Sequence, residues 1–154
     1  MCIRDSRWNV YGGFSYMPSK ILKTSAGANA STLYTVGKPF PNTPKYSFTT
    51  FTNYKVTPKL TLGGGAIYMG RVYGGFSSGP GLVDGVTVTK TRATYVPNYW
   101  RFDANASYQL TNLIKLQINA LNLTNKLYYD QAYATHYAHQ AAGRTILGTV
   151  SLRY

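Results

Sequence analysis

Apolar and polar residues alternate with a period of two through most of this sequence. In the clearest stretch, residues 99–110, every second side chain from Trp100 to Leu110 is apolar or small, and those between them are mostly polar. Strict alternation over such lengths is typical of strands with one apolar and one polar face. We expect six such strands, at residues 8–16, 46–56, 60–73, 99–110, 114–123 and 145–154.

The expected strands are long, and the connections between them alternate in length. Strands of roughly 9 to 13 residues exceed the usual length of about 5–6 residues and match the roughly 9–11 residues of a membrane-crossing strand. Residues 57–59 and 111–113 form tight turns, whereas three long loops are expected at residues 17–45, 74–98 and 124–143. Short turns on one side and long loops on the other are typical of outer-membrane barrels.

Aromatic residues gather near both ends of the expected strands, on the apolar face. Small and aliphatic residues such as Gly64, Ala104 and Ile118 lie between them. Two aromatic belts around an aliphatic band are typical of the two membrane interfaces. The predicted interface aromatics are Trp8, Tyr16, Tyr54, Tyr68, Trp100, Tyr108 and Tyr154.

The composition excludes several other classes of protein. The chain has 154 residues, a net charge of +12, only 4 Asp and Glu, a single Cys and 15 Tyr. Disordered basic tails are poor in aromatic residues, disulfide modules need paired Cys, and zinc modules need clustered Cys and His. Because no catalytic arrangement of Ser or Cys with His and Asp can be placed on one local scaffold, we expect no catalytic residues, no metal site and no enzyme.

Six strands are too few to close a membrane barrel, which needs about 8 strands or more. An open edge in hydrocarbon would leave backbone groups unpaired, so we expect residues 8–154 to be part of a larger barrel. Residues 1–7 lack the alternating pattern and are expected to be a non-native or disordered leader. No signal peptide precedes the first strand, so the chain is expected to be the C-terminal end of a longer protein.

Several segments, in order, resemble the C-terminal strands of TonB-dependent outer-membrane receptors, the siderophore-receptor group in particular. The likeness covers residues 8–154. It rests on residues 8–16, 44–48, the Gly-rich 62–68, 97–103, the segment Asn119-Ala-Leu-Asn-Leu-Thr-Asn-Lys-Leu-Tyr128, and Gly143-Arg144 with the strand that follows. The last of the quoted segments is similar to the family pattern N-x-x-N-L-x-(D/N)-K-x-Y. The terminal Tyr154 is similar to the family's terminal aromatic residue.

This resemblance implies an all-β fold, an antiparallel transmembrane barrel of about 22 strands that surrounds a plug domain, of which this chain supplies the last six. It implies a receptor in the bacterial outer membrane that takes up ferric siderophores. The implied partners are the siderophore, the TonB complex through an N-terminal region not in this chain, outer-membrane lipid and lipopolysaccharide, and the barrel assembly machinery. No cofactor is implied, because the siderophore carries the iron, and no nucleic acid is expected.

The long loops hold the candidate ligand contacts. Ferric siderophores are commonly anionic, and a basic mouth would attract them by long-range steering; binding to lipopolysaccharide phosphates, or solubility alone, is the alternative for the same cations. Direct metal binding by His136 and His139 would need two further ligands, which are not visible nearby. The candidate ligand-binding residues are Lys90, Arg92, Tyr95, Tyr99, His136, Tyr137 and His139.

A charge network is expected on the polar, lumenal face. Arg101 and Asp103 lie two residues apart on one strand, so their side chains share a face, and Arg144 lies where the last long loop meets the last strand. We expect a structural pairing of Arg101 with Asp103 in a lumenal network that extends to the plug. The glycines Gly63, Gly64 and Gly65 are not followed by a helix start, so they are expected to let a strand bend or an aromatic neighbour pack over them.

Three other functions stay open at this point. A passive outer-membrane channel or an adhesin-type barrel would lack the plug domain. Another TonB-dependent importer would carry cobalamin, haem or a glycan. A soluble basic β-protein could bind nucleic acid through Lys, Arg and stacked Tyr, but it would not need paired aromatic belts.

Overall fold

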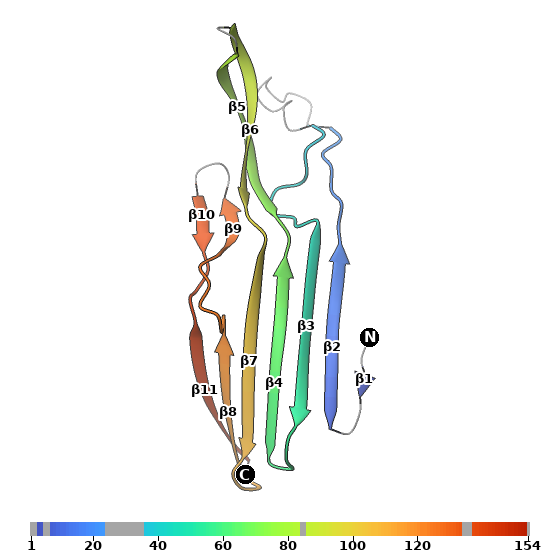
Figure 1. The fold of residues 1–154 in the computed structure, drawn as a ribbon, viewed down its shortest axis with the longest axis vertical. Helices are drawn as coiled ribbons and strands as arrows, with labels where there is room; N and C mark the ends of the chain where they lie inside the picture. Colours follow the sequence, from blue (N-terminus) through green and yellow to red (C-terminus); the bar gives the residue numbers. More distant parts are fainter. Residues whose placement is uncertain (1–2, 5–6, 24–35, 84–85, 134–136, 154) are drawn as a thin grey trace.

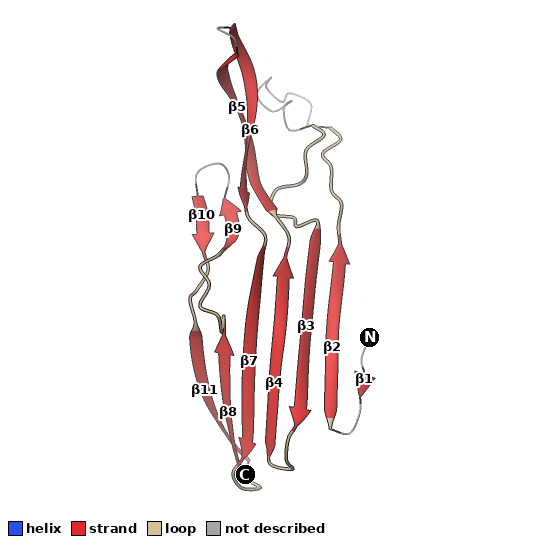
Figure 2. Ribbon diagram, in the orientation of Figure 1, coloured by secondary structure: helices blue, strands red, loops and turns tan. Residues whose placement is uncertain are grey.

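The computed structural model describes residues 3–4, 7–23, 36–83, 86–133 and 137–153. Within these ranges all regular elements are strands, and they form one large sheet with two hairpins above it (Figures 1 and 2). No helix in the described residues is long and apolar enough to cross a membrane. The strands are β1 (Ile3–Arg4), β2 (Trp8–Tyr16), β3 (Tyr46–Lys55), β4 (Leu60–Met69), β5 (Val72–Val83), β6 (Val86–Val96), β7 (Tyr99–Gln109), β8 (Ile114–Leu121), β9 (Tyr129–Tyr133), β10 (Tyr137–Gln140) and β11 (Thr145–Leu152).

The large sheet, here called the strand wall, has the order β1-β2-β3-β4-β7-β8-β11. Every neighbouring pair in it is antiparallel. Its six long strands are those that the alternation predicts, so the fold class is confirmed. The largest boundary difference is in β4, which ends at Met69 rather than at residue 73. Buried Gly70 donates its N–H to the carbonyl of Tyr46 at 2.9 Å, and beyond it the chain pairs with β6 instead.

The register places the six predicted apolar faces on one side of the wall. Trp8 is opposite Tyr54, and Tyr54 is opposite Leu62 on the next strand. Because directly opposed residues point to the same side of a sheet, matching rows extend from β2 to β11. The polar residues share the other side, where Asn53 is opposite Gly63 and Asn105 is opposite Asn119.

Both tight turns of the wall lie at the lower end in Figure 1 and use the same device. The hydroxyl oxygen of Thr57 accepts the N–H groups of Lys59 and Leu60 at 3.3 and 3.0 Å. Thr111 accepts those of Leu113 and Ile114 at 3.3 and 3.1 Å. A threonine that caps its own turn in this way favours a short reversal, as predicted for both connections.

The second and third long connections contain strands, which corrects the expectation of plain loops. β5 and β6 form a hairpin that projects beyond the wall, with a register shift between Tyr73 and Gly75 (Figure 1). β9 and β10 form a shorter hairpin above β8 and β11. The alternation of Val and Thr in β6 is typical of a strand. The adjoining β5 sequence is rich in Gly and Ser, which are typical of loops, so the whole connection was interpreted as a loop.

Residues 3–4 are paired rather than loose. Ile3 and Arg4 lie antiparallel to Val10 and Asn9 at the outer edge of β2. Residues 1–2 and 5–6 lie outside the described residues, and the leader at residues 1–7 stays a prediction.

Candidate functional site

Above the wall, the described side chains form a small apolar core. Val72, Val96 and Ala132 are buried together, with Met69 packed against them. They come from β5, β6, β9 and the end of β4, so this core fixes the two hairpins against each other. The chain leading into β3 joins through Asn42, whose N–H donates to the carbonyl of Tyr73 at 2.7 Å and whose Oδ1 accepts the N–H of Ala132 at 3.3 Å.

On the polar side of β7, Arg101 and Asp103 are bonded to each other. The Nε and one terminal nitrogen of Arg101 donate to Oδ2 of Asp103 at 3.2 and 2.8 Å. The Asp103 side chain is 10% exposed, and its second oxygen accepts the backbone N–H of Asn122 at 2.9 Å. Asp103 is therefore fully engaged in joining β7 to the segment that follows β8.

Asn122 is the polar centre of that segment and is only 2% exposed. Its Nδ2 donates to the carbonyls of Lys126 and Ala142 at 2.9 and 3.3 Å, and its Oδ1 accepts the N–H of Lys126 at 3.0 Å. Its φ of 51° lies in the left-handed region, which Asn tolerates better than most residues. The Asn122 side chain thus closes this turn and joins it to the segment that leads into β11.

Asn125 repeats the arrangement one step further along. It also has a left-handed φ, of 50°. Its Oδ1 accepts the backbone N–H of Arg144 at 2.9 Å, and a Cβ added at Gly143 would lie 3.2 Å from the same oxygen. The N-x-x-N-L-x-N-K-x-Y segment therefore forms a cluster of local hydrogen bonds made by Asn122 and Asn125 with their partners. We call this hydrogen-bonded cluster the asparagine knot, although the chain is not topologically knotted there.

The knot extends to an aromatic pair. Tyr128 is buried, and its ring centroid lies 4.3 Å from that of Tyr99. The carbonyl of Tyr128 accepts the N–H of Ala141 at 3.0 Å. Tyr99, a predicted ligand contact, is thus packed into the joint between β7 and the shorter hairpin.

The other predicted ligand contacts are spread over both hairpins. Tyr95 in β6 lies under Arg71, whose Cζ is 4.4 Å from the ring centroid. In the shorter hairpin, Tyr137 is 71% exposed and Nδ1 of His139 lies 2.7 Å from Oδ1 of Asp130. Lys90 and Arg92 are placed only by their backbone, opposite Gly79 and Ser77, and their side chains lie outside the described part, as does His136.

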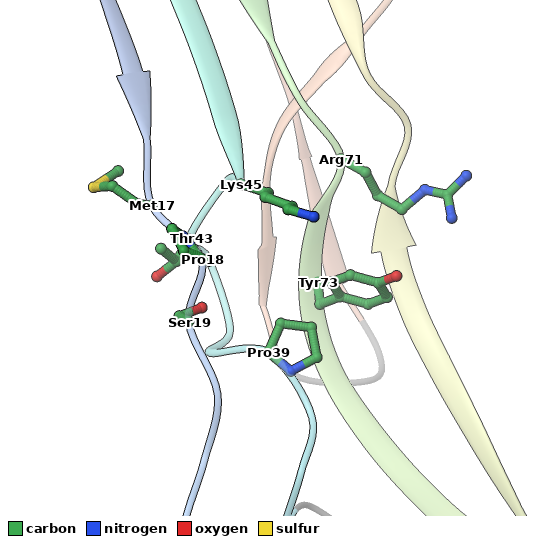
Figure 3. A pocket seen from close by; sticks show the side chains of 8 residues that line it. All are labelled: Met17, Pro18, Ser19, Pro39, Thr43, Lys45, Arg71 and Tyr73. Carbon is green, nitrogen blue, oxygen red and sulfur yellow. The ribbon is translucent and has the colours of Figure 1, made fainter.

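Two cations that border hollows are absent from the predicted site. A cavity of about 280 Å³ lies between the chain after β2 and the start of β5 (Figure 3). Lys45 and Arg71 border both this cavity and a neighbouring hollow. Lys45 lies beside the first long loop and belongs to the basic loop residues that the sequence singles out, whereas nothing in the sequence singles out Arg71. The cavity is lined by Met17, Pro18, Ser19, Pro39, Thr43, Lys45, Arg71 and Tyr73.

The predicted interface aromatics lie in two rows on the apolar side of the wall. Trp8 and Tyr54 are direct cross-strand neighbours near the turns, and Tyr108 is opposite Leu60 on the same side. At the other end, Tyr68 lies opposite Trp100 with ring centroids 5.0 Å apart, and Tyr16 stacks on Tyr46 at the same distance. Tyr154 lies outside the described residues.

The described side chains form no cluster of metal ligands. In the described ranges, no group of three or more His, Cys, Asp or Glu side chains could hold an ion. Arg144, predicted to join the charge network of Arg101, is exposed and enters the asparagine knot through its backbone N–H.

Comparison with known proteins gives consistent matches. The family described as "TonB dependent receptor-like, beta-barrel" matches residues 4–123. The probable TonB-dependent receptor BfrD of Bordetella pertussis is 40% identical over 96% of this chain and 19% of its own length. The probable TonB-dependent siderophore receptor PiuA of Acinetobacter baumannii is 36% identical, again over 96% of the chain and 19% of the relative.

Solved structures agree on the fold. The crystal structure of the siderophore receptor PiuA from Acinetobacter baumannii superposes with a TM-score of 0.78 at 35% identity, over 97% of this chain and 20% of that one. The closed form of the ferric-catecholate import receptor Fiu from E. coli gives 0.73 at 22% identity, over 97% and 19%. The chain thus spans about a fifth of the length of the curated relatives that it matches.

Proposed function

The chain belongs to the TonB-dependent receptor β-barrel family, and from this premise we propose that it forms the last six strands of a receptor that imports ferric siderophores. Proteins of this family reside in the outer membrane. The named function of relatives such as PiuA supports the choice of siderophores. The process is transport: the ligand crosses the membrane without chemical conversion.

The observation that carries this proposal is the two-faced wall. Its apolar side carries exposed large residues such as Phe14, Ile118 and Val150, at 68%, 55% and 64% exposure. Large exposed apolar surfaces mark contact with another apolar phase or partner. The opposite side carries Asn, Gln and the Arg101–Asp103 pair, which suits a lumen that holds water or a plug. A wall of this kind serves a barrel in lipid.

In this proposal the hairpins above the wall form part of the extracellular mouth. Arg101, Asp103 and Tyr99 are partly buried, and the Asp103 side chain is only 10% exposed, so we assign them to support. Tyr137 and the side chain of His139 are about 70% exposed on β10, so their exposure makes them better candidates for contact with the ligand, together with Lys90 and Arg92 by charge. The TonB complex and the assembly machinery are proposed partners of the whole receptor.

Uptake of radiolabelled iron tests the proposal. A strain that lacks the full-length gene should lose TonB-dependent uptake of at least one ferric siderophore from a panel of catecholate, hydroxamate and mixed chelates, and a plasmid copy should restore it. Normal iron uptake with lost uptake of cobalamin, haem or a glycan would assign the receptor to that substrate instead. Uptake that continues without TonB would identify a passive channel.

A further inference from the structure

The first long connection, residues 17–45, leaves β2 on one arm and returns to β3 on another. Backbone hydrogen bonds join the two arms at two levels. The N–H of Met17 donates to the carbonyl of Lys45 at 3.0 Å, and further out the N–H of Ile21 donates to that of Lys38 at 2.9 Å. A contact that holds the returning arm therefore holds the outgoing arm as well.

The returning arm is stiff around Asn42. Pro39, Pro41 and Pro44 each fix their own φ, and Asn42 has a left-handed φ of 54°. A proline followed by a left-handed Asn is the order that a type II turn favours. The hydroxyl of Thr43 donates to the carbonyl of Pro41 at 3.3 Å. A turn of this kind limits the directions in which the Asn42 side chain can point.

Asn42 makes one hydrogen bond to each of the two hairpins. Its backbone N–H donates to the carbonyl of Tyr73 in β5 at 2.7 Å. Its side-chain Oδ1 accepts the N–H of Ala132 in β9 at 3.3 Å, across 90 residues of sequence. Because Ala132 is only 1% exposed, removing this acceptor from its buried N–H should be costly.

The position of Asn42 gives these bonds their importance. Figure 1 shows the returning arm passing beside the base of the β5–β6 hairpin before it enters β3. The two hairpins already share the core of Val72, Val96 and Ala132, to which the first connection contributes no side chain. We propose that Asn42 is a positioning residue, which joins the first connection to both hairpins so that the three long connections move as one body.

This joining has a consequence for the mouth of the receptor. The cavity of about 280 Å³ lies between the first connection and the start of β5, so it keeps its shape only while Asn42 holds the two together. The candidate ligand contacts Tyr137 and His139 on β10 would also keep a fixed spacing from the first connection. That consequence rests on the proposed function, whereas the joining itself does not.

Amide hydrogen exchange in the full-length receptor, without any ligand, tests the side-chain bond. Asn42→Gly keeps the left-handed backbone and the bond to Tyr73 but removes Oδ1, so exchange at the Ala132 N–H should rise about five-fold. Asn42→Asp restores an oxygen acceptor and should return the rate to that of the wild type. Asn112→Gly, at an exposed position in the lower turn, is the control and should change nothing. An unchanged rate in Asn42→Gly would overturn the proposal.

A distance measurement tests whether the connections move together. Spin labels at Phe40→Cys and Gln140→Cys, both exposed positions, report the spacing between the first connection and β10 by pulsed electron paramagnetic resonance. The distribution should be narrow with Asn42, at least two-fold broader in Asn42→Gly and narrow again in Asn42→Asp. A narrow distribution in the glycine variant would reduce Asn42 to a local contact and reject the proposal, as would a broad one in the aspartate variant.

Folding of every variant is checked by the shift in electrophoretic mobility on heating. Neither measurement uses a substrate, so a receptor that imports something other than a ferric siderophore would leave both expected results unchanged.

Discussion

The strand wall and the two hairpins above it hold their apolar residues in opposite ways. In the wall, large apolar side chains are exposed along one side, as Phe14 and Val150 are. In the hairpin region, apolar residues are enclosed by protein: Val72, Val96 and Ala132 are at most 5% exposed. The wall therefore requires an apolar solvent, whereas the hairpins carry a small core like that of a water-soluble domain.

This difference places the two regions in different surroundings within one chain. Backbone hydrogen bonds join the wall, and membrane lipid can cover its apolar side. In the proposed receptor the hairpins stand in the aqueous region, and they are held by packing and by the asparagine knot. Substitutions should therefore follow different rules in the two regions, and the predictions below use the full-length receptor.

The largest effect is expected for a charge placed on the lipid side of the wall. Ala104 faces that side in the middle of β7, opposite Gly64 and Ala120. Ala104→Arg should destabilise the barrel by about 2–4 kcal/mol, measured as the urea midpoint of unfolding in lipid vesicles. Asn105→Arg, one residue along on the polar side, is the control and should change it much less. Equal losses in the two variants would mean that the two sides are not distinct.

The asparagine knot, which joins wall to hairpin, should be next. Asn122→Ala removes three side-chain hydrogen bonds from a buried site and should cost about 1–3 kcal/mol, with added strain from the left-handed backbone. Asn122→Gly removes the same hydrogen bonds, but glycine adopts the left-handed backbone conformation without strain, so this variant should be destabilised less. Protease cleavage between β8 and β11 reports the loss. If the alanine variant were as resistant as the wild type, the knot would not hold the hairpin.

Alanine substitutions at two glycines of β4 should show at which position glycine is required because neighbouring atoms leave no room for a side chain. A Cβ at Gly63 would collide with the side-chain oxygens of Asn53 and Asn105 and lie 2.9 Å from the carbonyl of Thr52, whereas at Gly64 the nearest atom is 3.6 Å away. Gly63→Ala should cost about 1–2 kcal/mol, and Gly64→Ala should be neutral, as measured by the same urea midpoints. A neutral Gly63→Ala would show that the two amides can move aside.

The wall was predictable from the sequence because its pattern of apolar and polar residues is set within each strand. Alternation from Trp100 to Leu110 depends only on which side of a strand each residue faces, and the register then follows from matching apolar rows. Gly65 also met expectation: the Phe51 ring packs where its Cβ would be, and Phe51 stacks on Tyr11 at 5.5 Å on the polar side.

The hairpins were missed because their signals are weaker or non-local. Val83 and Val86 flank Asp84-Gly85, a dipeptide that favours a hairpin turn, but the surrounding Gly and Ser favour a loop interpretation. The role of Arg71 depends on Tyr95, which is brought to it only by the β5–β6 pairing. No spacing along the chain encodes that contact.

The smallest effect is expected at the exposed ion pair of the shorter hairpin. His139 and Asp130 lie 2.7 Å apart, but their side chains are 69% and 39% exposed, and exposed pairs contribute about 0–1 kcal/mol. Asp130→Asn should leave the protease resistance of the β9–β10 region near that of the wild type, because the buried Ala132 and the Asn42 hydrogen bond still anchor it. Ala132→Asp, which places a charge in the enclosed core, should open the same region. If Asp130→Asn opened it as readily, the hairpin would depend on surface charge rather than on a core, and the contrast with the wall would fail.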